Sequence, residues 1–438
     1  MTSSALGSVS SSRGRLLGVD AARGVALLGM VATHVVTATT DDGTPRLTMM
    51  AFAGVSSALF VILAGMGLAL STGGADGVSA RPELPWRRRL ALRAAVLFAL
   101  GLLVGMWETS VAIILCHYAL MFLLALPLVP LGSRALGWLA GAWLVLGPVA
   151  VFALTATGYA SLGVSAVAIE GRLWLSPAPG DLAHPGLLVA DLVLTGYYPV
   201  LSWMGFLVLG LALGRMRWTP PRALRWGGAG ALLWLVLLVV GRVQTADEGF
   251  VARLSAAIQR WVYPSGELST TLLTGEHTLR WVIPDPVWLL VVSPHSGSVL
   301  EALRVSGYAV AVLGACLLLS WRVPRAVGTR AARSGAVGTR AVGELGPRAV
   351  GALGTRAVDM LGLGALAMIG RIPLTLYVGH IAALALLKNV GIDVHQLPVP
   401  LAVGGFWAGC IAVAGMLRLT GRSGPLEAGV TAASRVTG

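Results

Sequence analysis

The chain is dominated by apolar runs that are each long enough to cross a lipid bilayer, which takes about 20 residues per helix. These runs fall near residues 17–38, 47–71, 89–107, 109–130, 135–157, 187–214, 226–243, 298–321, 360–388 and 397–418. Because lipid offers no partners for backbone N–H and C=O groups, each run is expected to be a helix. The predicted fold is an all-α polytopic membrane protein with about ten transmembrane helices, or eleven.

Composition supports lipid as the main solvent. Hydrophobic residues make up 56% of the 438 residues and charged residues only 12%, with a mean hydropathy of +0.80. The net charge of +13 could suggest nucleic acid as a partner. However, the arginines lie between apolar runs and form no face interleaved with aromatic residues, so we expect no nucleic-acid binding.

The distribution of Arg and Lys predicts the orientation. Connections on the N-terminal side of the bundle carry about three times as many Arg and Lys residues as the opposite connections. Both termini are therefore predicted to be cytoplasmic, in a multi-pass protein of the plasma membrane. The predicted parts are a tail (1–16), spans one to eight (17–321) with an outer loop (244–297), a disordered basic loop (322–359), spans nine and ten (360–418), and a second tail (419–438).

Ionisable residues inside spans are costly and usually face a bundle interior or a wet cavity. Several of them are predicted to lie in the outer half of the bilayer, which suggests a polar cavity that opens outward with Arg371 at its floor. They are His34, Glu108, His117, Asp191, His295, Arg304 and His380. Pro373, between Arg371 and His380, is expected to kink span nine.

Simpler explanations stand beside these functional ones. Asp20 and Arg23 are three residues apart on one helix face and could merely neutralise each other. His117 could hydrogen-bond a neighbouring helix, and His34 could be solvated at its helix end. No two histidines have metal-ligand spacing on one helix, and the three cysteines offer no ligand pattern, so no metal is expected.

Several segments together resemble the YeiB-type and heparan-alpha-glucosaminide N-acetyltransferase-like membrane family. These segments, in order, are GVDAARGVALLGMVATHV, SSALFVILAGMGLAL, YYPVLSWMGFLVLGLALGR, SPHSGS, GRIPLTLYVGH and GRSGPLEAG. The resemblance implies a bundle that moves an acetyl or other acyl group from cytoplasmic acyl-CoA to a sugar-like or lipid-linked acceptor outside.

The resemblance also sets the candidate roles. The characterised acetyltransferase carries its essential His between spans one and two, where this chain reads TTDDGTPRLTMM and has none. Either His34, at a position held by Asn there, takes over as the base, or the transfer chemistry is absent.

If His34 is the base, Asp41 or Glu108 would orient it, and His380 and Tyr377 would steady the oxyanion or the acceptor. Arg23 and Arg371 would hold acyl-CoA. The residues expected to bind substrate are His117, Asp191, Tyr198, His295, Arg304 and Tyr377. Membrane lipids and the acceptor are the expected partners, with a homodimer as a further alternative. The rival function is a transporter or flippase that uses the same cavity without covalent chemistry.

Overall fold

The computed structural model describes residues 3–77, 86–107, 109, 111–162, 176–257, 268–275, 285–322 and 362–434. Glu108 and most of the predicted basic loop, residues 323–359, lie outside the described residues. The described part is helical and contains no β-strand beyond one isolated bridge between Thr39 and Pro45. The predicted all-α class is confirmed.

Helices of the described part overlap the segments predicted as spans. They are α1 (Ser3–His34), α3 (Val55–Ser71), α4 (Trp86–Val104), α5 (Leu115–Ala125), α6 (Ser133–Leu162), α9 (Val200–Gly214), α10 (Pro220–Ala246), α14 (Val299–Arg322), a helix at Gly362–Arg371, α16 (Pro373–Asn389) and α17 (Val399–Leu419). The short helices are α2 (Leu47–Phe52), α8 (Pro185–Ala190), α11 (Glu248–Ala257), α12 (Leu268–Thr274) and α18 (Pro425–Ala433). Single turns of other helix types include η4 (Asp191–Thr195) and η5 (Pro286–Leu290).

Among the described residues, five helices are long and apolar enough to cross a membrane alone, and seven spans result if each of two bent pairs counts as one. The bent pairs are Pro185–Thr195 with Val200–Gly214, at 57°, and Gly362–Arg371 with Pro373–Asn389, at 83°. The second bend confirms the kink predicted at Pro373. The remaining predicted spans coincide with α1, α4 and α5, of which α1 and α4 carry charged residues and α5 has only 11 residues.

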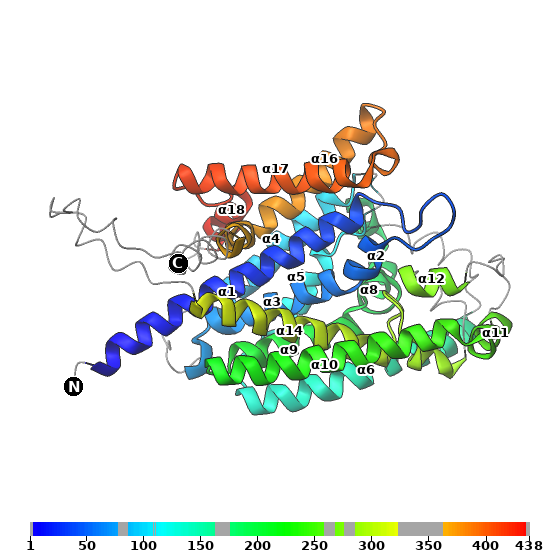
Figure 1. Cartoon of the computed structure of the whole chain (residues 1–438), viewed down its shortest axis with the longest axis horizontal. Helices are drawn as coiled ribbons and strands as arrows, with labels where there is room; N and C mark the ends of the chain where they lie inside the picture. Colours follow the sequence, from blue (N-terminus) through cyan, green and yellow to red (C-terminus); the bar gives the residue numbers. More distant parts are fainter. Residues whose placement is uncertain are drawn as a thin grey trace, which may run out of the picture.

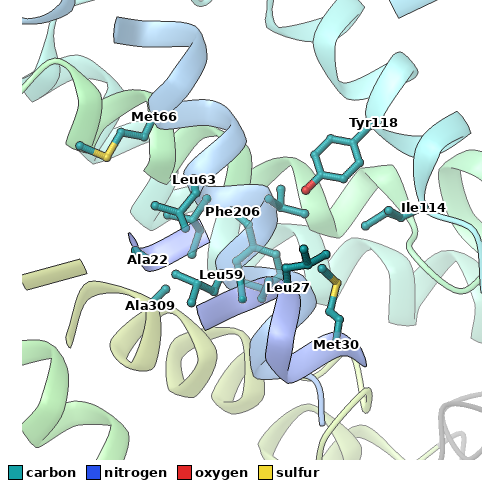
Figure 2. Packing of buried hydrophobic residues seen from close by; sticks show 14 of the residues in the cluster. Ala22, Leu27, Met30, Leu59, Leu63, Met66, Ile114, Tyr118, Phe206 and Ala309 are labelled. Carbon is teal, nitrogen blue, oxygen red and sulfur yellow. The ribbon is translucent and has the colours of Figure 1, made fainter. Parts of the chain in front are cut away.

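α3 forms the centre of the bundle because its sequence is apolar on every face. Glycines allow it to pack closely on α9: a β carbon at Gly65 would lie 2.1 Å from the carbonyl oxygen of Leu207. Leu59 and Leu63 of α3 meet Ala22 and Leu27 of α1 in the apolar core (Figure 2). In contrast, α6, α10 and α17 expose large apolar side chains, as expected for faces in contact with lipid.

The helix at Gly362–Arg371 packs against α1 through two glycines. A β carbon at Gly24 would lie 2.1 Å from the carbonyl oxygen of Leu366, and one at Gly370 would lie 1.7 Å from that of Asp20. The chain then bends, and Pro373 begins α16 at a position where a missing N–H costs nothing. The segment 419–438, predicted as a tail, contains α18, whose Glu427 carboxylate accepts hydrogen bonds from the amides of Leu374 (2.7 Å) and Thr375 (3.1 Å). Glu427 thus caps α16.

The two ends of the bundle differ in what they carry. The start of α1 and α18 lie at one end, and the C-terminal end of α1, with α2, α11 and α12, lies at the other (Figure 1). We call these the Asp20 end and the His34 end, because Asp20 and His34 lie near the corresponding ends of the buried part of α1.

Candidate active site between two cavities

Two cavities lie in the bundle and share part of their walls. The histidine cavity, of about 430 Å³, is lined by residues that include His34, Ser56, Tyr197, Tyr198, His295 and His395. The arginine cavity, of about 340 Å³, is lined by residues that include Asp20, Arg23, Arg93, Tyr118, Arg371 and Glu427. Phe60 of α3 and Tyr377 of α16 line both. These two side chains therefore lie between the cavities.

His34 and His380 form a hydrogen-bonded pair at the histidine cavity. Nδ1 of His34 lies 3.0 Å from Nε2 of His380, and the rings meet edge to edge, with planes 12° apart and centroids separated by 5.3 Å. His380 is buried, whereas His34 is partly buried and lines the cavity.

The backbone decides which ring nitrogens carry protons. Nδ1 of His380 lies 3.2 Å from the carbonyl oxygen of Leu376, which only accepts hydrogen bonds, so this nitrogen is the donor. In neutral His380 the Nε2 atom is then an acceptor, and His34 must donate to it from Nδ1. Neutral His34 is left with a basic lone pair on Nε2. This is the arrangement that a general base requires.

Aromatic side chains form much of the remaining wall of the histidine cavity. The hydroxyl of Tyr377 accepts a hydrogen bond from the amide of Ile114 at 3.3 Å, and the Tyr377 ring contacts that of His380 edge-on. Tyr197 packs against Tyr198 and, edge-on, against His295. His295 has a left-handed backbone, with φ of 61°, a conformation that costs energy in a residue other than glycine.

Three predicted binding residues line neither cavity. His117 is buried and packs edge-on against Tyr198 without lining either cavity. Asp191 accepts a hydrogen bond from the Thr195 hydroxyl at 2.7 Å within η4. Arg304 donates two hydrogen bonds to Glu301, at 2.7 and 2.8 Å, in a buried ion pair that satisfies both groups.

The acids predicted to orient His34 do not lie beside it among the described residues. Asp41 is exposed in the connection between α1 and α2, and Glu108 is outside the described residues. The neighbour on Nδ1 of His34 is instead the imidazole of His380. The reason is that α1 and α16 converge at this level, whereas Asp41, farther along its loop, does not line the cavity.

The arginine cavity contains a network of charges around Asp20. This carboxylate lies 3.0 Å from Nη1 of Arg23 and 3.5 Å from Nε of Arg371. Gly67 makes room for the guanidinium of Arg23, because a β carbon there would lie 2.6 Å from Nη2. Arg371, predicted at the floor of the histidine cavity, belongs instead to the arginine cavity, since the chain bends by 83° directly after it. Its side chain is 64% exposed.

Several cavity residues were not predicted from the sequence. Arg93 of α4 lies over the ring of Phe122, with 5.6 Å between its Cζ and the ring centroid. Ser56 and Tyr118 are buried, and their hydroxyls have no hydrogen-bond partner within the described part of the chain. Of these residues, only Arg93 has a feature in the sequence that could indicate a functional role, because it is an isolated charge within an apolar run.

No group of three or more potential metal ligands occurs among the described residues. The absence of a metal nevertheless remains a prediction, since part of the chain is not described.

The family model for the catalytic domain of heparan-alpha-glucosaminide N-acetyltransferase matches residues 15–245, more than half of the chain. The chain belongs to this family. Searches of the curated proteins and of the solved structures found no match. The match makes this acetyltransferase-like chain a multi-pass membrane protein, as its apolar helices also indicate.

The family match covers one side of the site. His34, Arg23, Phe60 and Tyr118 lie within residues 15–245, while the helices that carry Arg371 and His380 lie beyond them. The site is therefore assembled from both the matched and the unmatched part of the chain.

Proposed function

We propose that this protein is a transmembrane acyltransferase, in which acyl-CoA occupies the arginine cavity and the acceptor occupies the histidine cavity. The observation that carries the proposal is that Phe60 and Tyr377 line both cavities. An acyl group held between these side chains would be accessible to a nucleophile from the histidine cavity, while the rest of the donor remained on the arginine side.

The arginine cavity suits an anionic donor. If all its groups are ionised, the three arginines at positions 23, 93 and 371 outweigh the carboxylates of Asp20 and Glu427 by one positive charge (3 − 2 = 1). Arginine binds phosphate oxygens through its planar fork of donors. The exposed Arg371 would meet the pyrophosphate of CoA, and the partly buried Arg23 would lie closer to the pantetheine arm.

The histidine pair provides the base. As the amine or hydroxyl of the acceptor attacks the thioester carbonyl, its proton passes to Nε2 of His34. The Nδ1 proton of His34 can then move toward Nε2 of His380, so that the positive charge is shared by two rings. The tetrahedral intermediate collapses with cleavage of the carbon–sulfur bond, and the proton held by His34 passes, directly or through water, to the departing CoA thiolate, which restores neutral His34.

Charge distribution supports an orientation. In the predicted topology the connections on the side of Asp20 are rich in arginine, so we propose that this side is cytoplasmic, with both termini there and ten spans. Cytoplasmic acyl-CoA would then enter at this end, and a sugar-like or lipid-linked acceptor would bind at the extracytoplasmic face of the plasma membrane.

The test uses membrane vesicles that contain the native protein, acetyl-CoA labelled in the acetyl group, and a panel of amino sugars and lipid-linked sugars as acceptors. We expect transfer by the native protein and a large loss in His34→Ala. His184→Ala is the matched control, because His184 is exposed and lines neither cavity. Equal transfer by the native protein and His34→Ala would remove His34 from the mechanism, and movement of an acceptor across donor-free vesicles would favour transport instead.

A further inference from the structure

Tyr118 is a buried tyrosine that lines the arginine cavity and whose hydroxyl has no hydrogen-bond partner among the described residues. The side chain is 3% exposed and comes from the first turn of α5. A buried hydroxyl without a partner costs about 1–3 kcal/mol, so native proteins seldom retain one without a use. Because the Tyr118 side chain lines the arginine cavity, a ligand bound there is a candidate partner for this hydroxyl.

The surroundings of Tyr118 place it near the partition between the cavities. Its ring packs edge-on against Phe60, with centroids 5.9 Å apart, and Phe60 is one of the two residues that line both cavities. Tyr377, the other, also lines the arginine cavity with Tyr118. Figure 2 shows the Tyr118 hydroxyl directed from its helix toward the core around Phe206 and Leu27.

The two tyrosines of the arginine cavity differ in how they can act. The oxygen of Tyr377 already accepts the amide hydrogen of Ile114, whereas both the proton and the lone pairs of the Tyr118 hydroxyl are unused by the described residues. A phenol in an apolar site is an effective hydrogen-bond donor to an oxyanion.

We propose that the Tyr118 hydroxyl donates a hydrogen bond to the carbonyl oxygen of the donor thioester and stabilises the oxyanion that forms on it. This inference rests on the proposed function. In the step, the acceptor nitrogen or oxygen bonds to the thioester carbon while its proton goes to His34. The carbonyl π electrons move onto the oxygen held by Tyr118, and they return to re-form the carbonyl as the carbon–sulfur bond breaks. Tyr118 keeps its own proton throughout.

Kinetics of Tyr118→Phe provide the first test, with Tyr308→Phe on α14 as the matched control because Tyr308 lines neither cavity. Loss of one oxyanion donor lowers kcat about 10²–10³-fold. We expect such a loss in Tyr118→Phe with a nearly unchanged KM for acetyl-CoA, and native kinetics in Tyr308→Phe. An unchanged kcat in Tyr118→Phe would overturn the proposal.

An infrared measurement separates this inference from the proposed function. Acetyl-CoA labelled with ¹³C at the carbonyl is bound to native protein and to Tyr118→Phe in detergent, and the thioester stretch is recorded. We expect a lower frequency in the native protein, where the carbonyl is hydrogen-bonded, than in the variant. Identical frequencies would refute the role of Tyr118 even if the native protein transfers acetyl groups. A frequency difference without transfer would retain the contact and reject the proposed function, and failure of acetyl-CoA to bind would overturn both.

Discussion

Gly370 packs directly against the carbonyl oxygen of Asp20, with no space for a β carbon between the two backbones. This contact holds Arg371 beside the Asp20 carboxylate and thereby fixes the geometry of the arginine cavity.

Gly370→Ala should destabilise the protein. The new β carbon would lie 1.7 Å from a backbone oxygen, so the two helices must separate. Overpacking of this kind costs about 1–3 kcal/mol or more. We expect a lower apparent Tm and less monodisperse protein in detergent, measured by thermal unfolding and size-exclusion chromatography. Gly379→Ala in α16 is the control, because a β carbon there meets nothing within 4 Å; equal stability of the two variants would contradict the packing described.

His380→Ala should reduce transfer less than His34→Ala. Loss of the base lowers the transfer rate about 10²–10⁴-fold. Loss of His380 instead leaves His34 in place but removes the hydrogen-bond acceptor that fixes the tautomer of His34. Initial rates at saturating donor and acceptor would measure both effects. A native rate in His380→Ala would show that the pair has no role in orienting the base.

Arg371→Ala should mainly weaken donor binding. The side chain is 64% exposed and lies at the arginine cavity, where it can reach anionic groups of CoA. We expect a higher KM for acetyl-CoA with a kcat close to native. Arg242→Ala, a substitution in α10 away from this cavity, is the control. A selective fall in kcat for Arg371→Ala would instead place Arg371 in the chemical step.

Glu427→Ala should destabilise the start of α16, because the amides of Leu374 and Thr375 would lose their acceptor. Loss of a helix cap costs about 0.5–2 kcal/mol. Glu427→Gln, which keeps an acceptor oxygen, should recover part of the stability. Hydrogen exchange at the two amides is the measurement, and unchanged protection in Glu427→Ala would exclude the cap.

Acid should release the contact between α11 and η5. The hydrogen bond from Arg253 holds the pKa of Asp285 below its ordinary value of 3.8. A carboxyl with a lowered folded-state pKa contributes its stabilisation above the unfolded pKa and loses it as pH falls through the folded one. The rate of limited proteolysis of the 244–297 segment should therefore stay constant from pH 7 to about 5 and rise only below about pH 4. Asp285→Asn should be cleaved faster already at pH 7, and a native rate in this variant would count against the contact.

Hydropathy located the helices well because each bilayer crossing needs a long apolar run. The depth predicted for each residue also brought His34, His295 and His380 to one level; in the structure His34 and His295 line the histidine cavity, and His380 lies beside His34. The depth of a residue in the membrane does not predict which side chains are in contact, because contacts depend on how closely the helices pack at glycines such as Gly24. For the same reason His117 was grouped with them although it lies behind Tyr198.

The position of Arg371 required knowledge of the bend. Treated as one straight span, the segment places Arg371 directly below His380, whereas the 83° bend takes it to the other cavity. The role of Glu427 was likewise hidden, because the cap joins residues more than 50 positions apart.

The bend before Pro373 also has a thermodynamic consequence. One continuous segment carries Arg371 at the arginine cavity, Tyr377 between the two cavities and His380 beside His34 of the histidine cavity, so a ligand that shifts this segment from one cavity alters the shape of the other. Such coupling is reciprocal: if one ligand changes the affinity for the other by a given factor, the second ligand changes the affinity for the first by the same factor. If donor and acceptor occupy the two cavities as proposed, the binding of each should therefore change the affinity for the other.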